Sequence, residues 1–241
     1  MEKLSQNFLD TCKREDGFII RGENMTRIET FVDAAFAFAI TMLVISLDAI
    51  PRSVSELFTA SKDIPAFLVS GIQIGFIWFR HSQWSRRFGL QDITTIFLSL
   101  CLVMLVLVFI YPLKLVYMGM FSWLSDGYLS TGLGGMKLGE LANLFVYFAI
   151  GFICLSVIFY LFYQNTLSKS EQLGLTQYER YFCQTESIAW IILALVALLS
   201  GILAKTLPGR SIIAAGFTYS LLGIAYTVLY RVRNKNEPEK D

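Results

Sequence analysis

Side chains that build catalytic and metal sites are scarce in this sequence of 241 residues, which has 1 histidine and 4 cysteines. The cysteines show no paired spacing, so neither a zinc site nor a disulfide framework is predicted. No nucleophile motif or cluster of metal ligands accompanies the histidine, which argues against an enzyme and against a bound cofactor. Lysine and arginine number 20 against 19 acidic residues, so the chain has no electrostatic basis for binding nucleic acid.

Long apolar runs are what the sequence has instead, since 55% of its residues are hydrophobic and 15% are aromatic. A run of about 20 apolar residues is long enough to cross a bilayer as a helix. We therefore expect an all-α, multi-pass integral protein of the cell membrane, surrounded by lipid, with six transmembrane helices. Their approximate ranges are 27–47, 64–84, 93–117, 138–163, 187–205 and 211–230, and a short interfacial helix is expected over 53–63.

The basic residues predict how these helices are oriented. With six spans, most of the 20 lysine and arginine residues fall on the side of the two termini. Because short cytoplasmic loops carry the excess of such residues, both termini are predicted to be cytoplasmic. This divides the chain into a cytoplasmic N-terminal segment (1–26), a transmembrane domain (27–231) and a cytoplasmic tail (232–241).

The first apolar run, Arg27 to Leu47, carries a carboxylate, Asp33, about one turn inside its start. A carboxylate in a membrane is costly, so it marks a candidate functional site. In the same run Phe38, Met42 and Ile45 recur at helical spacing and form one bulky apolar stripe. The stripe has two interpretations: it faces lipid, or it lines a narrow pore, because apolar constrictions can gate ions by dewetting.

Asp33 is expected to need a partner from another helix. Arg27 lies six residues earlier, about 240° away around the helix, so the two cannot pair along one face. Trp78 and His81, in the second run, reach a comparable depth if the two helices are antiparallel neighbours. His81 is thus either an interfacial residue hydrogen-bonded near its helix end or a buried partner of Asp33.

These residues carry a resemblance to a known family. Arg27-x-x-x-Phe31-Val32-Asp33 resembles the first-helix motif of the transmembrane protein 175 family of potassium channels. Trp78-Phe-Arg-His81 is similar to the Trp-x-x-His of that family's second helix. The sequence departs from the family at two positions. Val32 stands where the motif usually has serine, and Phe38 stands where many members have isoleucine or leucine.

The resemblance implies a homotetramer in which the first helix of each subunit lines a central pore, with potassium as the permeant ion. Phe38, Thr41 or Met42, and Ile45 would form stacked rings, and discrimination would depend on how easily each ion loses water at an apolar constriction. The resemblance further implies that a second set of residues supports the pore helix from behind: Arg27, Phe31, Asp33, Trp78 and His81.

Two other functions stay open on the sequence alone. The first is a proton-coupled transporter or proton pathway that uses Asp33 and His81 as relay groups, although transporters usually show internal repeats and interrupted helices, which this sequence lacks. The second is a membrane scaffold that conducts no ion, which the composition does not exclude.

Overall fold

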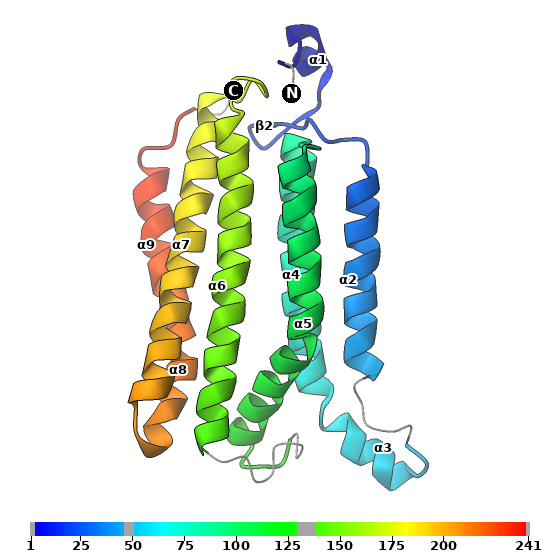
Figure 1. The fold of residues 1–241 in the computed structure, drawn as a ribbon, viewed down its shortest axis with the longest axis vertical. Coiled ribbons are helices and arrows are strands. Elements are labelled where there is room, and N and C mark those ends of the chain that lie inside the picture. Colours follow the sequence, from blue (N-terminus) through cyan, green and yellow to red (C-terminus); the bar gives the residue numbers. More distant parts are fainter. Residues whose placement is uncertain (1–2, 46–50, 130–137, 240–241) are drawn as a thin grey trace.

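The computed structural model describes residues 3–45, 51–129 and 138–239, and they form a bundle of long helices with a small cap at one end (Figure 1). The cap begins with α1 (Gln6–Thr11) and a hairpin of β1 (Arg14–Glu15) and β2 (Phe18–Ile19). Asp16 and Gly17 turn the hairpin with positive φ angles of 52° and 86°, which suits Asp-Gly. The sequence did not predict this hairpin, because strands of two residues leave no readable alternation.

Five long helices follow the cap. They are α2 (Arg27–Ile45), α4 (Ile64–Phe88), α5 (Ile93–Leu124), α6 (Leu138–Ser168) and α7 (Gln177–Thr206), with the short α3 (Val54–Ser61) between α2 and α4. A short helix is therefore confirmed within the predicted range 53–63. The last part of the chain is η2 (Gly209–Ile212), α8 (Ile213–Phe217), η3 (Thr218–Ser220) and α9 (Leu221–Asn234).

Several helix limits differ from those expected. The third run continues to Leu124, beyond its predicted end at 117. The stretch between the predicted fourth and fifth spans is largely helical, because α6 continues to Ser168 and because Thr176 and Glu179 form a capping box that starts α7 at Gln177. The sixth run is not one continuous helix, since 3₁₀ turns interrupt it before and after α8.

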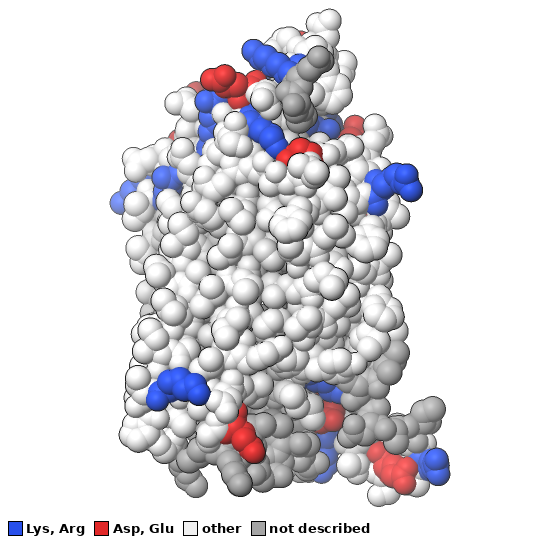
Figure 2. Space-filling view, viewed as in Figure 1, with Lys and Arg blue, Asp and Glu red and all other residues white. Residues whose placement is uncertain are grey.

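Four stretches of the described residues are long and apolar enough to cross a membrane: α5, α6, α7 and the stretch from α8 through α9. Figure 2 shows the corresponding surface, a broad belt without charged side chains between two charged ends. The chain is thus an all-helical, multi-pass integral membrane protein. In Figure 1, α2 and α4 run alongside the other long helices, and both termini lie at the capped end.

One buried core joins the helices. Around its centre, Trp84 of α4 packs on Phe162 of α6 with ring centroids 4.4 Å apart, and Phe159 stacks on Trp190 of α7 at 4.2 Å. Pro112 lies inside α5, and Figure 1 shows this helix bending along its length, as expected where proline removes a backbone hydrogen bond. The core therefore links α2, α4 and α5 to the helices that follow.

Candidate pore helix and its supporting network

α2 has one buried and one exposed face. Val32, Phe36, Ala39 and Leu43 are buried against the core, to which α4 and α5 contribute. The opposite side of the helix is bare in the single chain, and it carries the following residues: Phe31, Ala34, Phe38 and Thr41. The phenylalanine side chains at 31 and 38 are 51% and 55% exposed. An apolar helix face of this kind needs lipid or another subunit to cover it.

The predicted stripe agrees only partly with this face. Phe38 lies on it, but Met42 is half-buried and packs against the core. Thr41, which the sequence left as the alternative to Met42, is exposed one turn from Phe38, and its hydroxyl donates to the Ala37 carbonyl at 3.0 Å. Ile45 ends α2, and its side chain lies outside the described part of the structure.

Asp33 has its partner on α4, as expected, but the partner is the indole. Trp78 Nε1 donates to Asp33 Oδ1 at 2.7 Å. His81, which is only 3% exposed, instead shares a hydrogen bond of 3.0 Å between its Nε2 and the Ser99 hydroxyl of α5. His81 therefore bonds Ser99 rather than Asp33, and its ring is buried against Phe162.

The remaining two members of the predicted support lie elsewhere. Arg27 and Phe31 are exposed on the first turns of α2 in the single chain. The start of α2 is held by a capping box, in which Thr26 N donates to Glu29 Oε2 at 2.6 Å and Glu29 N donates to Thr26 Oγ1 at 3.2 Å. The structure thus brings Asp33 and Trp78 together, places His81 on the next turn, and leaves Arg27 and Phe31 on the outer side.

Two ion pairs toward the capped end of the bundle were not predicted, one fully buried and one part-buried. Arg21 pairs with Glu179 at 2.8 Å, with side chains 1% and 0% exposed. Arg80 pairs with Glu186, whose other oxygen accepts from the Tyr230 hydroxyl at 3.1 Å. The spacing Thr176-x-x-Glu179 could have indicated the capping box, but no local pattern reveals an arginine 158 residues away from its partner.

The described residues offer ions no preformed cluster of side chains. Within 3–45, 51–129 and 138–239, no group of three or more histidine, cysteine, aspartate or glutamate side chains is placed to hold a metal ion. The exposed face of α2 combines aromatic rings with a hydroxyl.

Comparison with known proteins agrees with this geometry. Residues 27–112, which contain α2, α4 and most of α5 before its bend, match the family model described as the endosomal/lysosomal potassium channel TMEM175. A protein of Marivirga tractuosa named "Potassium channel" is 33% identical over 233 residues, covering 90% of this chain and 91% of the relative.

A solved structure is similar over nearly the same extent. It is the crystal structure of a threonine-to-alanine variant of the potassium channel MtTMEM175 in complex with a nanobody–MBP fusion protein. The TM-score is 0.80 at 30% identity, and the match covers 92% of this chain and 99% of that chain. The resemblance seen in the sequence is confirmed, and so is the prediction that this is not an enzyme, because the relatives are channels. The chain belongs to the TMEM175 family of potassium channels.

Proposed function

We propose that this protein is a potassium-permeable channel of the cell membrane, built from four copies of the chain around a pore lined by α2. The observation that carries the proposal is the bare face of α2, where Phe38 and Thr41 stand exposed opposite the buried face. A ring of four such faces would cover one another and leave an apolar constriction at Phe38 with hydroxyls at Thr41. Potassium is then the permeant ion, and no cofactor takes part.

We infer six crossings of the membrane: α2, α4, α5, α6, α7 and the stretch from α8 through α9. α2 and α4 have 19 and 25 residues, or about 28 Å and 37 Å at about 1.5 Å per residue, enough to cross the apolar layer. Arg27, Arg86 and Arg87 then lie on the cytoplasmic side, in line with the excess of basic residues there. The same topology makes residues 1–26 and 232–241 cytoplasmic.

Selectivity follows from the lack of polar ligands at the constriction. The backbone carbonyls of a helix are used within the helix, so they cannot replace the water around an ion as a ring of free carbonyls does. An ion that passes Phe38 must shed part of its water without compensation. Because potassium holds its water less tightly than sodium, it meets the lower barrier. Thr41 can still accept from the remaining water, because its hydroxyl proton goes to Ala37.

The hydrogen bonds of Asp33 and His81 support a channel over a proton relay. Asp33 is bonded to Trp78, and His81 is bonded to Ser99. The indole N–H donates but accepts no proton, so it cannot pass one along. A relay through Asp33 and His81 would need a direct contact between them or a chain of groups that both donate and accept.

The test is ion flux in liposomes that contain the purified protein, with potassium, sodium and proton gradients run in parallel. Phe38→Ala is expected to raise potassium flux several-fold and to lower the potassium-to-sodium permeability ratio, because the ring that narrows the pore is gone. Ile40→Ala is the matched control, since Ile40 is an exposed apolar residue on a different side of α2.

Each other outcome has a definite meaning. A ratio unchanged by Phe38→Ala would remove Phe38 from the constriction. Saturable, proton-coupled uptake that Asp33→Asn abolishes would identify a transporter. If a well-folded oligomer shows no flux of any cation, the protein is a membrane scaffold that conducts no ion.

A further inference from the structure

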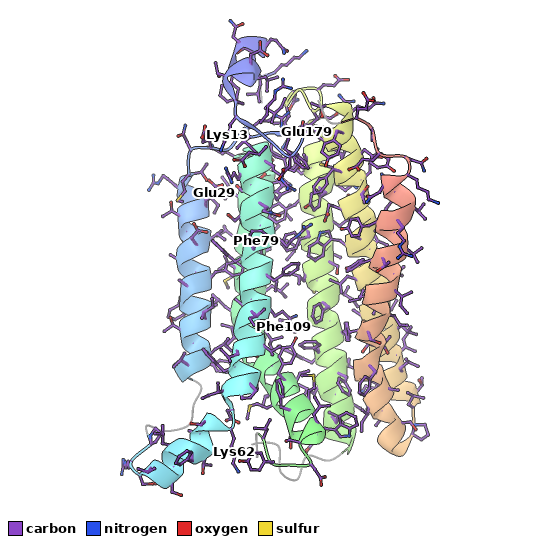
Figure 3. The ribbon with its side chains drawn as sticks, turned by 180° about the vertical axis from the view of Figure 1, so that it is seen from behind. Lys13, Glu29, Lys62, Phe79, Phe109 and Glu179 are labelled. Atoms are coloured by element: carbon purple, nitrogen blue, oxygen red, sulfur yellow. The ribbon has the colours of Figure 1, made fainter. Side chains whose placement is uncertain are left out.

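Two carboxylates lie on one face of α7, Glu179 and Glu186, seven residues or about 10 Å apart along the helix. Both are buried, at 0% and 3% exposure, with the buried Cys183 between them. Each carboxylate holds one arginine from a distant part of the chain, Arg21 for the first and Arg80 for the second. Figure 3 labels Glu179 at the capped end of the bundle, close to Lys13 of the hairpin segment.

The first arginine fixes the chain just before the proposed pore helix. Arg21 donates to both oxygens of Glu179 at 2.8 Å and to the carbonyls of Ile19, Leu173 and Gly174 at 2.9, 2.9 and 3.2 Å. Beside it, Gly22 N donates to the Arg86 carbonyl of α4 at 2.9 Å. Only a short linker separates Gly22 from the first residue of α2, so this clamp sets where α2 begins.

The second arginine, Arg80, lies on α4, the helix that also bonds α2. Arg80 pairs with Glu186, and its guanidinium also donates to the Tyr163 hydroxyl of α6 at 3.4 Å. Two residues earlier on α4, Trp78 donates to Asp33 of α2 at 2.7 Å. Trp78 and Arg80 thus tie the same segment of α4 to α2 and to α7, so a shift of that segment would also move the indole that holds α2.

We propose that Glu179 and Glu186 are positioning residues, which fix α2 at its start and one turn inside through Arg21 and Arg80. Neither carboxylate touches the proposed pore. The inference rests on the proposed function, because α2 must line the pore for its position to matter to permeation. Removing one partner of a buried charged pair leaves the other charge without compensation, so the remaining arginine must shift to find water or another acceptor.

The main variants are Glu186→Gln and Arg80→Gln, in the full-length protein in liposomes. Each is expected to change the potassium-to-sodium permeability ratio at least threefold, and the charge-swapped double variant Arg80→Glu with Glu186→Arg is expected to recover part of that change. The ratio does not depend on how much protein folds, so a merely structural loss would leave it unaltered. Arg21→Lys tests the first clamp, because it keeps the positive charge and leaves the Thr176–Glu179 capping box of α7 in place but removes the forked guanidinium that bonds both Glu179 oxygens.

Lys169→Gln is the matched control. Lys169 pairs with Asp92 at 2.6 Å and joins the start of α5 to the end of α6, with side-chain exposure of 19%, equal to that of Arg80. It lies outside the path from α7 to α2. We expect this variant to lower the thermal unfolding temperature and to leave the permeability ratio at the wild-type value.

A second measurement does not require ion flux. Backbone amide exchange over residues 27–33 is expected to accelerate at least fivefold in Glu186→Gln and to stay unchanged in Lys169→Gln. If neither the ratio nor the exchange rate changes in Glu186→Gln and Arg80→Gln, the positioning role is wrong. If the wild-type protein carries no potassium, the proposed function fails, and the exchange rates alone decide whether α7 positions α2.

Discussion

At the residue scale, the carboxylate that caps α5 has partners on its own helix and at the end of α6. Asp92, just before α5, accepts from the backbone N–H of Thr94 at 3.2 Å and from the Thr95 hydroxyl at 2.7 Å. Lys169 Nζ lies 2.6 Å from Asp92 Oδ2, the oxygen that also accepts from Thr94. Burial alone would raise the pKa of the Asp92 carboxyl, but the hydrogen bonds from Lys169, Thr95 and Asn165 outweigh burial and hold this pKa well below its ordinary value.

This carboxylate predicts a pH dependence of stability. Because its pKa is lower in the folded than in the unfolded protein, Asp92 stabilises the fold fully above its ordinary pKa of 3.8, and this contribution is lost as the pH falls further. Asp92→Asn keeps a good helix cap but loses the charge. Thermal unfolding should therefore show the variant less stable at pH 7, with the gap narrowing below pH 3.8. A gap that stays constant down to pH 3 would contradict this account of the ion pair.

At Asp33 the sequence predicted that a hydrogen-bond partner lies on α4, but it did not predict which residue that partner is. A carboxylate inside an apolar helix needs a donor, so Asp33 was correctly expected to meet α4. That Trp78 rather than His81 supplies the donor depends on rotation of α4, which turns the histidine toward Ser99 in the core. The sequence likewise left Thr41 and Met42 as alternatives for the ring after Phe38, and the rotation of α2 exposes Thr41 and half-buries Met42.

At the element scale, α5 and α6 pack closely at one glycine. The ring of Phe109, labelled in Figure 3, lies where a side chain at Gly151 would begin, and it stacks on Tyr147 with ring centroids 4.9 Å apart. The packing of α5 against α6 therefore depends on the absence of a methyl group at residue 151.

Gly151→Ala is accordingly expected to destabilise the protein by about 1–3 kcal/mol, the usual cost of overpacking, measured by thermal or denaturant unfolding in detergent. Gly71→Ala in α4 is the control, because a methyl group there would meet no atom within 4 Å, and alanine is the better helix former by about 1 kcal/mol. Adding Phe109→Ala to Gly151→Ala should relieve the overlap. If Gly151→Ala and Gly71→Ala are equally stable, the close packing at residue 151 is not as described.

The length of the apolar runs predicted that the long helices form. It did not predict where several of them end. α6 and α7 extend beyond their apolar parts because polar residues at their ends find partners on other elements. Glu179 and Glu186 would end an apolar helix if judged by composition, yet both are buried with arginines. The breaks around α8 have no comparable signal in composition.

At the scale of the whole molecule, the two ends of the bundle differ. Figure 3 labels Lys13 and Glu179 at the end that carries the hairpin and Lys62 at the opposite end, near α3. We expect the hairpin end to face the cytoplasm.

A fluorescent protein fused to either terminus should therefore fold and fluoresce, whereas alkaline phosphatase fused at the C-terminus should stay inactive. A cysteine-labelling reagent that cannot cross membranes should reach Lys62→Cys from outside the cell in a variant whose native cysteines are replaced. Active phosphatase at the C-terminus would reverse the proposed orientation.

The sequence by itself determined that this is a helical membrane protein, because apolar runs of this length can be buried only in a bilayer. It also identified the family through the Arg27–Asp33 motif and the Trp78–His81 pair. Only the tertiary structure decided which faces of α2 are bare and which arginine meets which carboxylate. These facts depend on helix rotation and on contacts between residues far apart in the chain, and neither leaves a local periodicity that can be read from the sequence.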